Sequence, residues 1–195
     1  MDHAALIRAA TQTLIDHVEE LTTLDQAIGD GDHGLNMKRG AEAIQAKLPE
    51  LATQGFNDAL KTMGMTCMSV IGGSSGPVFG TLLVTMSKEL PAQPKAIDLA
   101  RAMAAGIAAL TRLGKAEVGQ KTLLDVLDPV RRTLEAGGDG IVARVRQTAL
   151  DAAVATASMQ AIKGRASFLG ERALGNVDPG SRSMALIVAA VCDTL

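Results

Sequence analysis

The chain has 195 residues and a formal net charge of −2, and 47% of its residues are hydrophobic while only 2% are aromatic. This length suits one domain, and so large an apolar fraction excludes a disordered chain. The near-neutral charge and the scarcity of rings exclude a nucleic-acid module that works through a basic face with stacked aromatic side chains.

Apolar residues then recur at helical spacing along the whole sequence, beginning with Ile7, Leu14 and Leu21. Eight helices are predicted, near residues 7–21, 34–48, 57–70, 78–90, 95–113, 123–134, 141–163 and 181–191. Pro49 and Pro91 are expected to end the second and the fourth. Because no segment alternates like a strand, we predict an all-α fold: a single domain over residues 1–195, built as an antiparallel bundle.

Membrane and secretion signals are missing from the sequence. The longest apolar run, 184–192, has roughly half the length that a membrane span needs, and the acidic N-terminus lacks the features of a signal peptide. We therefore expect a cytoplasmic protein with neither a membrane nor a nucleic-acid partner.

The sequence contains 20 glycines, which helix interiors disfavour. Most of them lie between the predicted helices, in four loops that also carry Asp, Ser, Lys, Arg and His: 29–34, 72–77, 114–119 and 163–180. In an up-and-down bundle every second loop lies at the same end. These four loops are therefore expected to converge on one rim of the bundle.

The first loop is acidic and is a candidate metal site. Asp25, Asp30 and Asp32 follow one another at short spacing, and Gly29 and Gly31 allow sharp turns between them. Magnesium prefers such hard oxygen ligands, and a divalent cation would relieve the repulsion among three close carboxylates. The alternative is that Asp32 only caps the next helix while Asp30 lies in a turn.

The other loops suggest an anion site. Ser74 and Ser75 lie in a Gly-rich turn that opens the helix marked by Pro77, where backbone N–H groups can bind a phosphate. The long basic segment 163–180 has the composition of a lid, in which Arg165 could donate two hydrogen bonds to phosphate oxygens. An ordinary Ser-capped helix and a solvated loop are the alternatives.

Four motifs of the sequence together resemble the nucleotide-binding L subunit of dihydroxyacetone kinase, DhaL. In chain order they are GDGDHGLNM, GGSSGPVFGT, GKAEVGQKTLLDV and KGRASFLGERALGNVDPGS. The resemblance implies an eight-helix barrel that binds ADP or ATP through two Mg²⁺ ions at one rim. By matching position, it implies Asp25, Asp30 and Asp32 as magnesium ligands. It also implies nucleotide contacts at His33, Gly34, Leu35, Asn36, Ser74, Ser75, Gly114, Leu123, Arg165, Asp178, Pro179 and Gly180, with Arg165 orienting the phosphates for transfer.

The same resemblance implies a function shared with a partner. The L subunit passes a γ-phosphoryl group to dihydroxyacetone, or a related ketose, held on a separate K subunit (DhaK). In the favoured route the bound ADP is rephosphorylated by a phosphotransferase-system protein (DhaM), and in the other route free ATP is the donor. Two further alternatives are a regulatory module that contacts a transcription factor and a structural bundle whose loops bind nothing.

Overall fold

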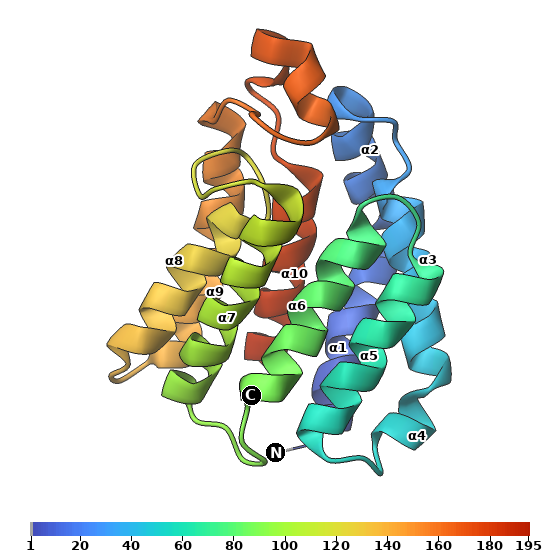
Figure 1. Ribbon diagram of the computed structural model, residues 1–195, viewed down its shortest axis with the longest axis vertical. Coiled ribbons are helices and arrows are strands. Elements are labelled where there is room, and N and C mark those ends of the chain that lie inside the picture. The colour runs from blue at the N-terminus through green and yellow to red at the C-terminus, as the bar shows by residue number, and fades with distance from the viewer. Residues whose placement is uncertain (1) are drawn as a thin grey trace.

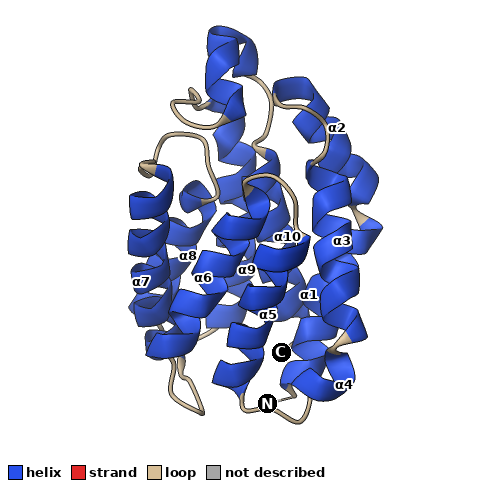
Figure 2. Ribbon diagram, turned by 45° about the vertical axis from the view of Figure 1, so that its right-hand side comes forward, coloured by secondary structure: helices blue, strands red, loops and turns tan. Residues whose placement is uncertain are grey.

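The computed structural model describes residues 2–195 and contains helices and loops without a strand in that range (Figure 2). The predicted all-α fold is therefore confirmed. The α-helices are α1 (His3–Asp16), α2 (Val18–Ile28), α3 (His33–Ala46), α4 (Leu48–Leu51), α5 (Phe56–Val70), α6 (Ser75–Glu89), α7 (Ala96–Gly114), α8 (Leu124–Ala136), α9 (Ile141–Ala155) and α10 (Pro179–Thr194), and the 3₁₀ segments are η1 (Thr156–Ser158) and η2 (Arg165–Ala173).

Eight of these helices close into a ring. Each packs on the next in the order α1, α3, α5, α6, α7, α8, α9, α10, and α10 packs on α1 again. The predicted count of eight helices holds for this ring only. Two further α-helices lie outside the count: α2 extends α1 towards the rim, and α4 is a single turn beside α3. Figure 1 shows the Gly-rich loops and η2 at the upper end of the ring and both termini at the lower end.

The ring is a barrel with an apolar interior. A cavity of about 440 Å³ lies inside it and is lined by residues from all eight ring helices, among them Leu14, Met63, Phe79, Met103 and Val145. The surrounding core is aliphatic, as the composition requires. No helix among residues 2–195 combines the length and the apolar character needed to cross a membrane.

Two predicted boundaries near the N-terminus are wrong. The first helix is interrupted at His17, whose backbone leaves the helical conformation (φ −106°, ψ 19°). The Nδ1 atom of the His17 ring lies 2.8 Å from the carbonyl oxygen of Thr13. Pro49 does not end the next long helix, since α3 already ends at Ala46. Pro49 instead lies in the first turn of α4, where its missing N–H is not needed.

The predicted helix 141–163 is also too long, because α9 ends at Ala155. The carbonyl of Thr156, which a continuing helix would use internally, accepts a hydrogen bond from Lys121 Nζ at 2.6 Å. The Thr156 hydroxyl donates to Ala153 and accepts from the backbone N–H of Asp178. Contacts from Lys121 and Asp178 thus meet the chain where α9 ends, and it continues through η1 into the expected lid region.

Candidate functional site

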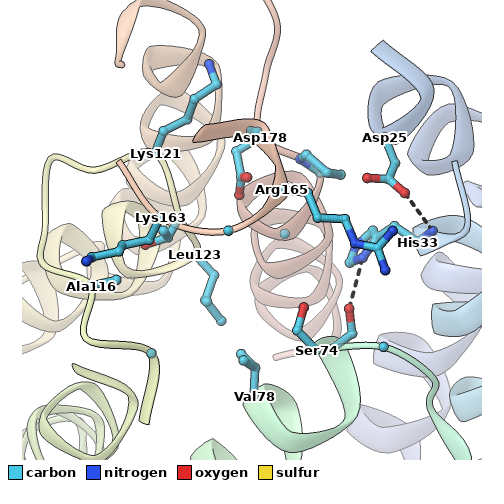
Figure 3. Close-up of a pocket in the computed structure, with 18 of the residues that line it drawn as sticks. Asp25, His33, Ser74, Val78, Ala116, Lys121, Leu123, Lys163, Arg165 and Asp178 are labelled. Atoms are coloured by element: carbon cyan, nitrogen blue, oxygen red, sulfur yellow. Dashed lines mark hydrogen bonds between the residues drawn. The ribbon is translucent and has the colours of Figure 1, made fainter. Parts of the chain in front are cut away.

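A second cavity, of about 340 Å³, opens at the rim where the four Gly-rich loops converge. Figure 3 shows labelled side chains from all four loop regions around this one space, with Asp25 and His33 on one side and Leu123 and Lys163 on the other. The lining residues are Asp25, Ile28, Asp30, Asp32, His33, Gly72, Gly73, Ser74, Ser75, Val78, Phe79, Leu110, Gly114, Ala116, Lys121, Thr122, Leu123, Leu124, Lys163, Gly164, Arg165, Ala166, Asp178, Pro179 and Gly180.

Three carboxylates form a cluster at one end of this cavity. Oxygen atoms of Asp25, Asp30 and Asp32 lie within 4.8 Å of one another, with Asp25 buried and the other two exposed. Asp32 occupies the N-cap position of α3, but its side chain makes no capping hydrogen bond there. The structure therefore contradicts the alternative that Asp32 serves only as a cap, and the hard oxygen donors suit a magnesium ion.

Local backbone geometry holds Asp25 in place. Its Oδ2 accepts a hydrogen bond from the backbone N–H of His33 at 3.0 Å, which links the end of α2 to the start of α3. Any side chain at Gly29 would collide with the Asp25 carboxylate. Glycine is therefore required at this turn for the three carboxylates to approach one another.

The His33 ring connects three elements of the rim. Its Nδ1 lies 3.2 Å from Ser75 Oγ at the start of α6, and its Nε2 lies 3.2 Å from Ser183 Oγ on α10. Ser183 Oγ donates its proton to the carbonyl of Gly180. Burial lowers the pKa of His33, against the opposing effect of Asp25 and Asp32. A neutral ring that donates from Nε2 and accepts the Ser75 proton at Nδ1 satisfies all these groups.

The three residues after His33 lie outside the lining of the cavity. Gly34 packs directly against α2, where a side chain would collide with the Val18 carbonyl and with Thr22. Leu35 is exposed, while Asn36 is buried and accepts from Arg39. The nucleotide contacts that the resemblance implies for Gly34, Leu35 and Asn36 therefore stay predictions.

The Gly-Ser turn presents the start of α6 to the cavity. Ser74 is the N-cap residue, but its side chain makes no capping hydrogen bond, which contradicts the simple Ser-capped alternative. Gly73 has a positive φ of 61°, which glycine adopts without strain. The free N–H groups of the first turn and the Ser74 hydroxyl are therefore available to an anion.

The opposite wall is apolar at its base and basic at its edge. Val78 and Leu123 form part of the apolar surface, whereas Lys163 and Arg165 line the lid side (Figure 3). Gly114 also lines the cavity. Arg165 forms an ion pair with Asp30, so the lid contacts the carboxylate cluster. The cavity thus combines an apolar wall with a carboxylate cluster, basic side chains and the Gly-Ser start of α6.

Lys121 also lines the cavity, and the sequence analysis assigned it no role. It is only 2% exposed, and its Nζ donates to the carbonyls of Thr156 and Asn176. A lysine in a Gly-rich loop is usually solvated, and its burial depends on carbonyls more than 30 residues away. No local pattern in the sequence indicates such partners.

Asp178, the N-cap residue of α10, is half-buried and lies near the charge of this lysine. Its Oδ2 accepts from the backbone N–H of Ser181 at 2.6 Å and caps the helix. Burial raises the pKa of Asp178 from its ordinary value of 3.8 to about 6, although the Ser181 hydrogen bonds and the nearby Lys121 charge oppose the shift. The folded chain therefore holds this proton more tightly than the unfolded chain.

Replacement of Asp178 by Asn is expected to remove a pH-dependent loss of stability. Between pH 4 and 6 the unfolded wild type releases the proton while the folded state retains it, so the free energy of unfolding falls by up to about 3 kcal/mol. Asn does not ionise, and its amide oxygen can still accept from Ser181. Urea unfolding from pH 4 to 7 should show this fall in wild type but not in the variant, which should be at least as stable as wild type at pH 7.

Asp2→Asn is the matched control, because Asp2 caps α1 through Ala5 but is exposed. Its stability difference from wild type should change little over the same pH range. Equal pH profiles for Asp178→Asn and wild type would contradict the raised pKa of Asp178.

Comparisons with known proteins agree with this geometry. The DAK2 domain family model matches residues 27–193. The chain is 41% identical to the PEP-dependent dihydroxyacetone kinase 1 ADP-binding subunit DhaL of Listeria innocua, over 89% of this chain and 86% of that one. It is 40% identical to the corresponding ADP-binding subunit DhaL of Escherichia coli, over 85% and 83% of the two chains.

Solved structures match over nearly the whole chain as well. The dihydroxyacetone kinase of C. freundii in complex with AMP-PNP and Mg²⁺ superimposes with a TM-score of 0.82 at 25% identity. The match covers 98% of this chain but only 33% of that one. The same barrel is therefore one part of a longer chain in that protein.

Proposed function

Because this chain belongs to the DAK2 domain family, we propose that it is the nucleotide-binding, phosphoryl-transferring subunit of a dihydroxyacetone kinase. The observation that carries the proposal is the single rim cavity in which the Asp25, Asp30 and Asp32 carboxylates meet the Gly-Ser start of α6. The family resemblance noted from the sequence is confirmed by the match to residues 27–193 and by the DhaL relatives.

The two halves of the cavity suit the two halves of a nucleotide. The apolar surface around Val78 and Leu123 fits a base. The N–H groups of the first turn of α6 and the Ser74 hydroxyl fit phosphate oxygens, which are acceptors only. ADP or ATP would therefore lie with its phosphates directed towards the carboxylate cluster.

Magnesium is part of this proposal, because three carboxylates this close repel a phosphate chain unless a cation lies between them. Asp25, Asp30 and Asp32 would hold it, and its chemistry is to neutralise charge on the phosphates during transfer. The C. freundii relative was solved with AMP-PNP and Mg²⁺, which supports this assignment. Two ions are expected from the family.

Arg165 is proposed to orient the transferred group. In the structure it pairs with Asp30, and both side chains are substantially exposed at the mouth of the cavity. Because a cation at Asp30 would compete with this pair, Arg165 is free to turn to the phosphates when the site fills. A guanidinium there stabilises charge on the phosphoryl group without acting as a nucleophile.

The acceptor is proposed to come from a separate subunit, the dihydroxyacetone-binding DhaK. In the C. freundii kinase this barrel makes up about a third of the chain. In the DhaL relatives the barrel is named a subunit, which supports an acceptor site on a different subunit. Three relatives are named ADP-binding subunits of PEP-dependent or PTS-dependent kinases. These names support the route in which bound ADP is rephosphorylated by a phosphotransferase-system protein rather than exchanged for free ATP.

Analysis of the bound nucleotide tests this function and its donor together. The purified protein is denatured and the released nucleotide identified by mass spectrometry, and transfer to dihydroxyacetone is then assayed with a DhaK subunit and either a phosphorylated phosphotransferase-system protein or ATP. Retained ADP and transfer from the phosphoprotein are expected. Transfer from free ATP alone would overturn the donor route, and transfer from neither donor would overturn the kinase function.

A further inference from the structure

Lys121 is a buried cation without an acidic partner in hydrogen-bond contact. In the described part of the chain it forms no ion pair, although its side chain is only 2% exposed. Its Nζ donates to the carbonyl oxygens of Thr156, at 2.6 Å, and Asn176, at 2.5 Å. Removing an ammonium group from water costs free energy, so a lysine buried at this position points to a specific task.

The two carbonyls lie at the two ends of the segment 156–176, which contains η1, η2 and most of the predicted lid. Thr156 follows the last residue of α9, and Asn176 precedes Asp178 at the start of α10. A backbone hydrogen bond from Gly175 N–H to the Ala157 carbonyl, at 2.8 Å, lies between them. The Lys121 ammonium therefore joins the two ends of the segment that contains η1 and η2. It also places a positive charge at the carboxyl end of α9.

The backbone around Lys121 is fixed independently of its side chain. Lys121 has a φ of 63°, a conformation that is rare for residues other than glycine. The adjacent Thr122 donates its N–H to Asp125 Oδ2 at 2.7 Å, and its carbonyl accepts from Ser181 Oγ at 2.8 Å. The ammonium therefore extends from a rigid turn and can impose a position on the lid rather than follow it.

This position matters for the rim cavity. Asp178, Pro179 and Gly180 form one wall of that cavity, and the Asp178 N–H donates to the Thr156 hydroxyl at 3.0 Å. We propose that Lys121 is a positioning residue that anchors both ends of the segment 156–176, and with it the lid, and thereby holds the wall formed by Asp178, Pro179 and Gly180 in place for the nucleotide. The effect on the nucleotide rests on the proposed function, whereas the anchoring of the lid does not.

Hydrogen exchange without any ligand tests the anchoring. Lys121→Met keeps an apolar stem of similar length but removes the ammonium that joins the two carbonyls. The Thr156 carbonyl then keeps only the N–H of Met159, at 3.1 Å, as a donor. The amides of Gly175 and Asp178 are expected to exchange at least about tenfold faster than in wild type, while those of α1 and α3 stay unchanged. Lys121→Arg, which retains N–H donors, should recover part of the protection.

Lys115→Met is the matched control. Lys115 lies in the same loop and also has a positive φ, of 49°, but its side chain is exposed. Its exchange pattern should equal that of wild type. Unchanged exchange at Gly175 and Asp178 in Lys121→Met, or equally faster exchange in every helix, would overturn the proposal.

Calorimetric titration with Mg-ADP then tests the effect on the site. Lys121→Met is expected to raise the Kd about tenfold at a temperature where the variant is fully folded, with partial recovery in Lys121→Arg. Faster lid exchange with an unchanged Kd would overturn the link to the cavity wall. A wild type that binds no Mg-ADP would overturn the proposed function instead, and the exchange pattern would still decide the anchoring.

Discussion

Asp30→Asn and Asp32→Asn are each expected to weaken Mg-ADP binding by at least about 100-fold in calorimetric titration. Each change removes one of three carboxylates whose oxygens lie within 4.8 Å of one another, so the remaining pair binds the cation poorly. Without the cation, the cluster repels the phosphates that the start of α6 would otherwise attract. Metal-free ADP should bind wild type weakly and the variants no more weakly, because each variant carries one carboxylate fewer.

Asp193→Asn is the matched control for Asp30→Asn. Asp193 is also an exposed aspartate paired with an arginine, Arg146, but it lies near the C-terminus at the opposite end of the barrel. Its loss should leave the Kd for Mg-ADP unchanged. Because like-charge repulsion is relieved, Asp32→Asn should also unfold no more easily than wild type in the absence of metal. Wild-type affinity in both cluster variants would rule out the magnesium site.

Gly34→Ala is expected to destabilise the fold by about 1–3 kcal/mol or more. An added methyl group would collide with the Val18 carbonyl and with the Thr22 hydroxyl and N–H on α2. Since backbone cannot move aside cheaply, α2 and α3 would have to separate. The loop between these helices carries Asp30 and Asp32, so Mg-ADP affinity should fall together with the melting temperature.

Gly114→Ala is the control for this substitution. Gly114 ends α7, and a methyl group there would meet nothing closer than the Ala116 Cβ at 4.0 Å. Thermal unfolding should show it as stable as wild type or slightly more so, since Ala favours helix. If Gly34→Ala lowered nucleotide affinity while leaving the melting temperature unchanged, Gly34 would act through the ligand rather than through helix packing.

The features that local patterns determine were predictable from the sequence. Helical periodicity placed the ring helices, and the up-and-down order brought the four Gly-rich loops to one rim. The acidic spacing predicted the cluster of Asp25, Asp30 and Asp32, which the structure brings together. These properties depend on neighbours within a few residues of each other, so composition and spacing carry them.

The features that depend on distant partners were missed. The chain leaves the helix after Ala155, where Lys121 bonds the Thr156 carbonyl, and no periodicity within 141–163 reveals that contact. Likewise, the His33 side chain is held by Ser75 and Ser183, residues that approach only when α3, α6 and α10 meet at the rim. Both cases involve a polar group that is satisfied across the barrel, which a single sequence does not encode locally.

The central claim is that the three carboxylates hold the cation of a bound nucleotide at the rim. Anomalous diffraction from crystals grown with Mn²⁺ and ADP tests it most directly, because manganese replaces magnesium and scatters anomalously. We expect anomalous density between Asp25, Asp30 and Asp32, with the ADP phosphates directed at the start of α6. Manganese elsewhere, or ADP bound outside the rim cavity, would contradict this account.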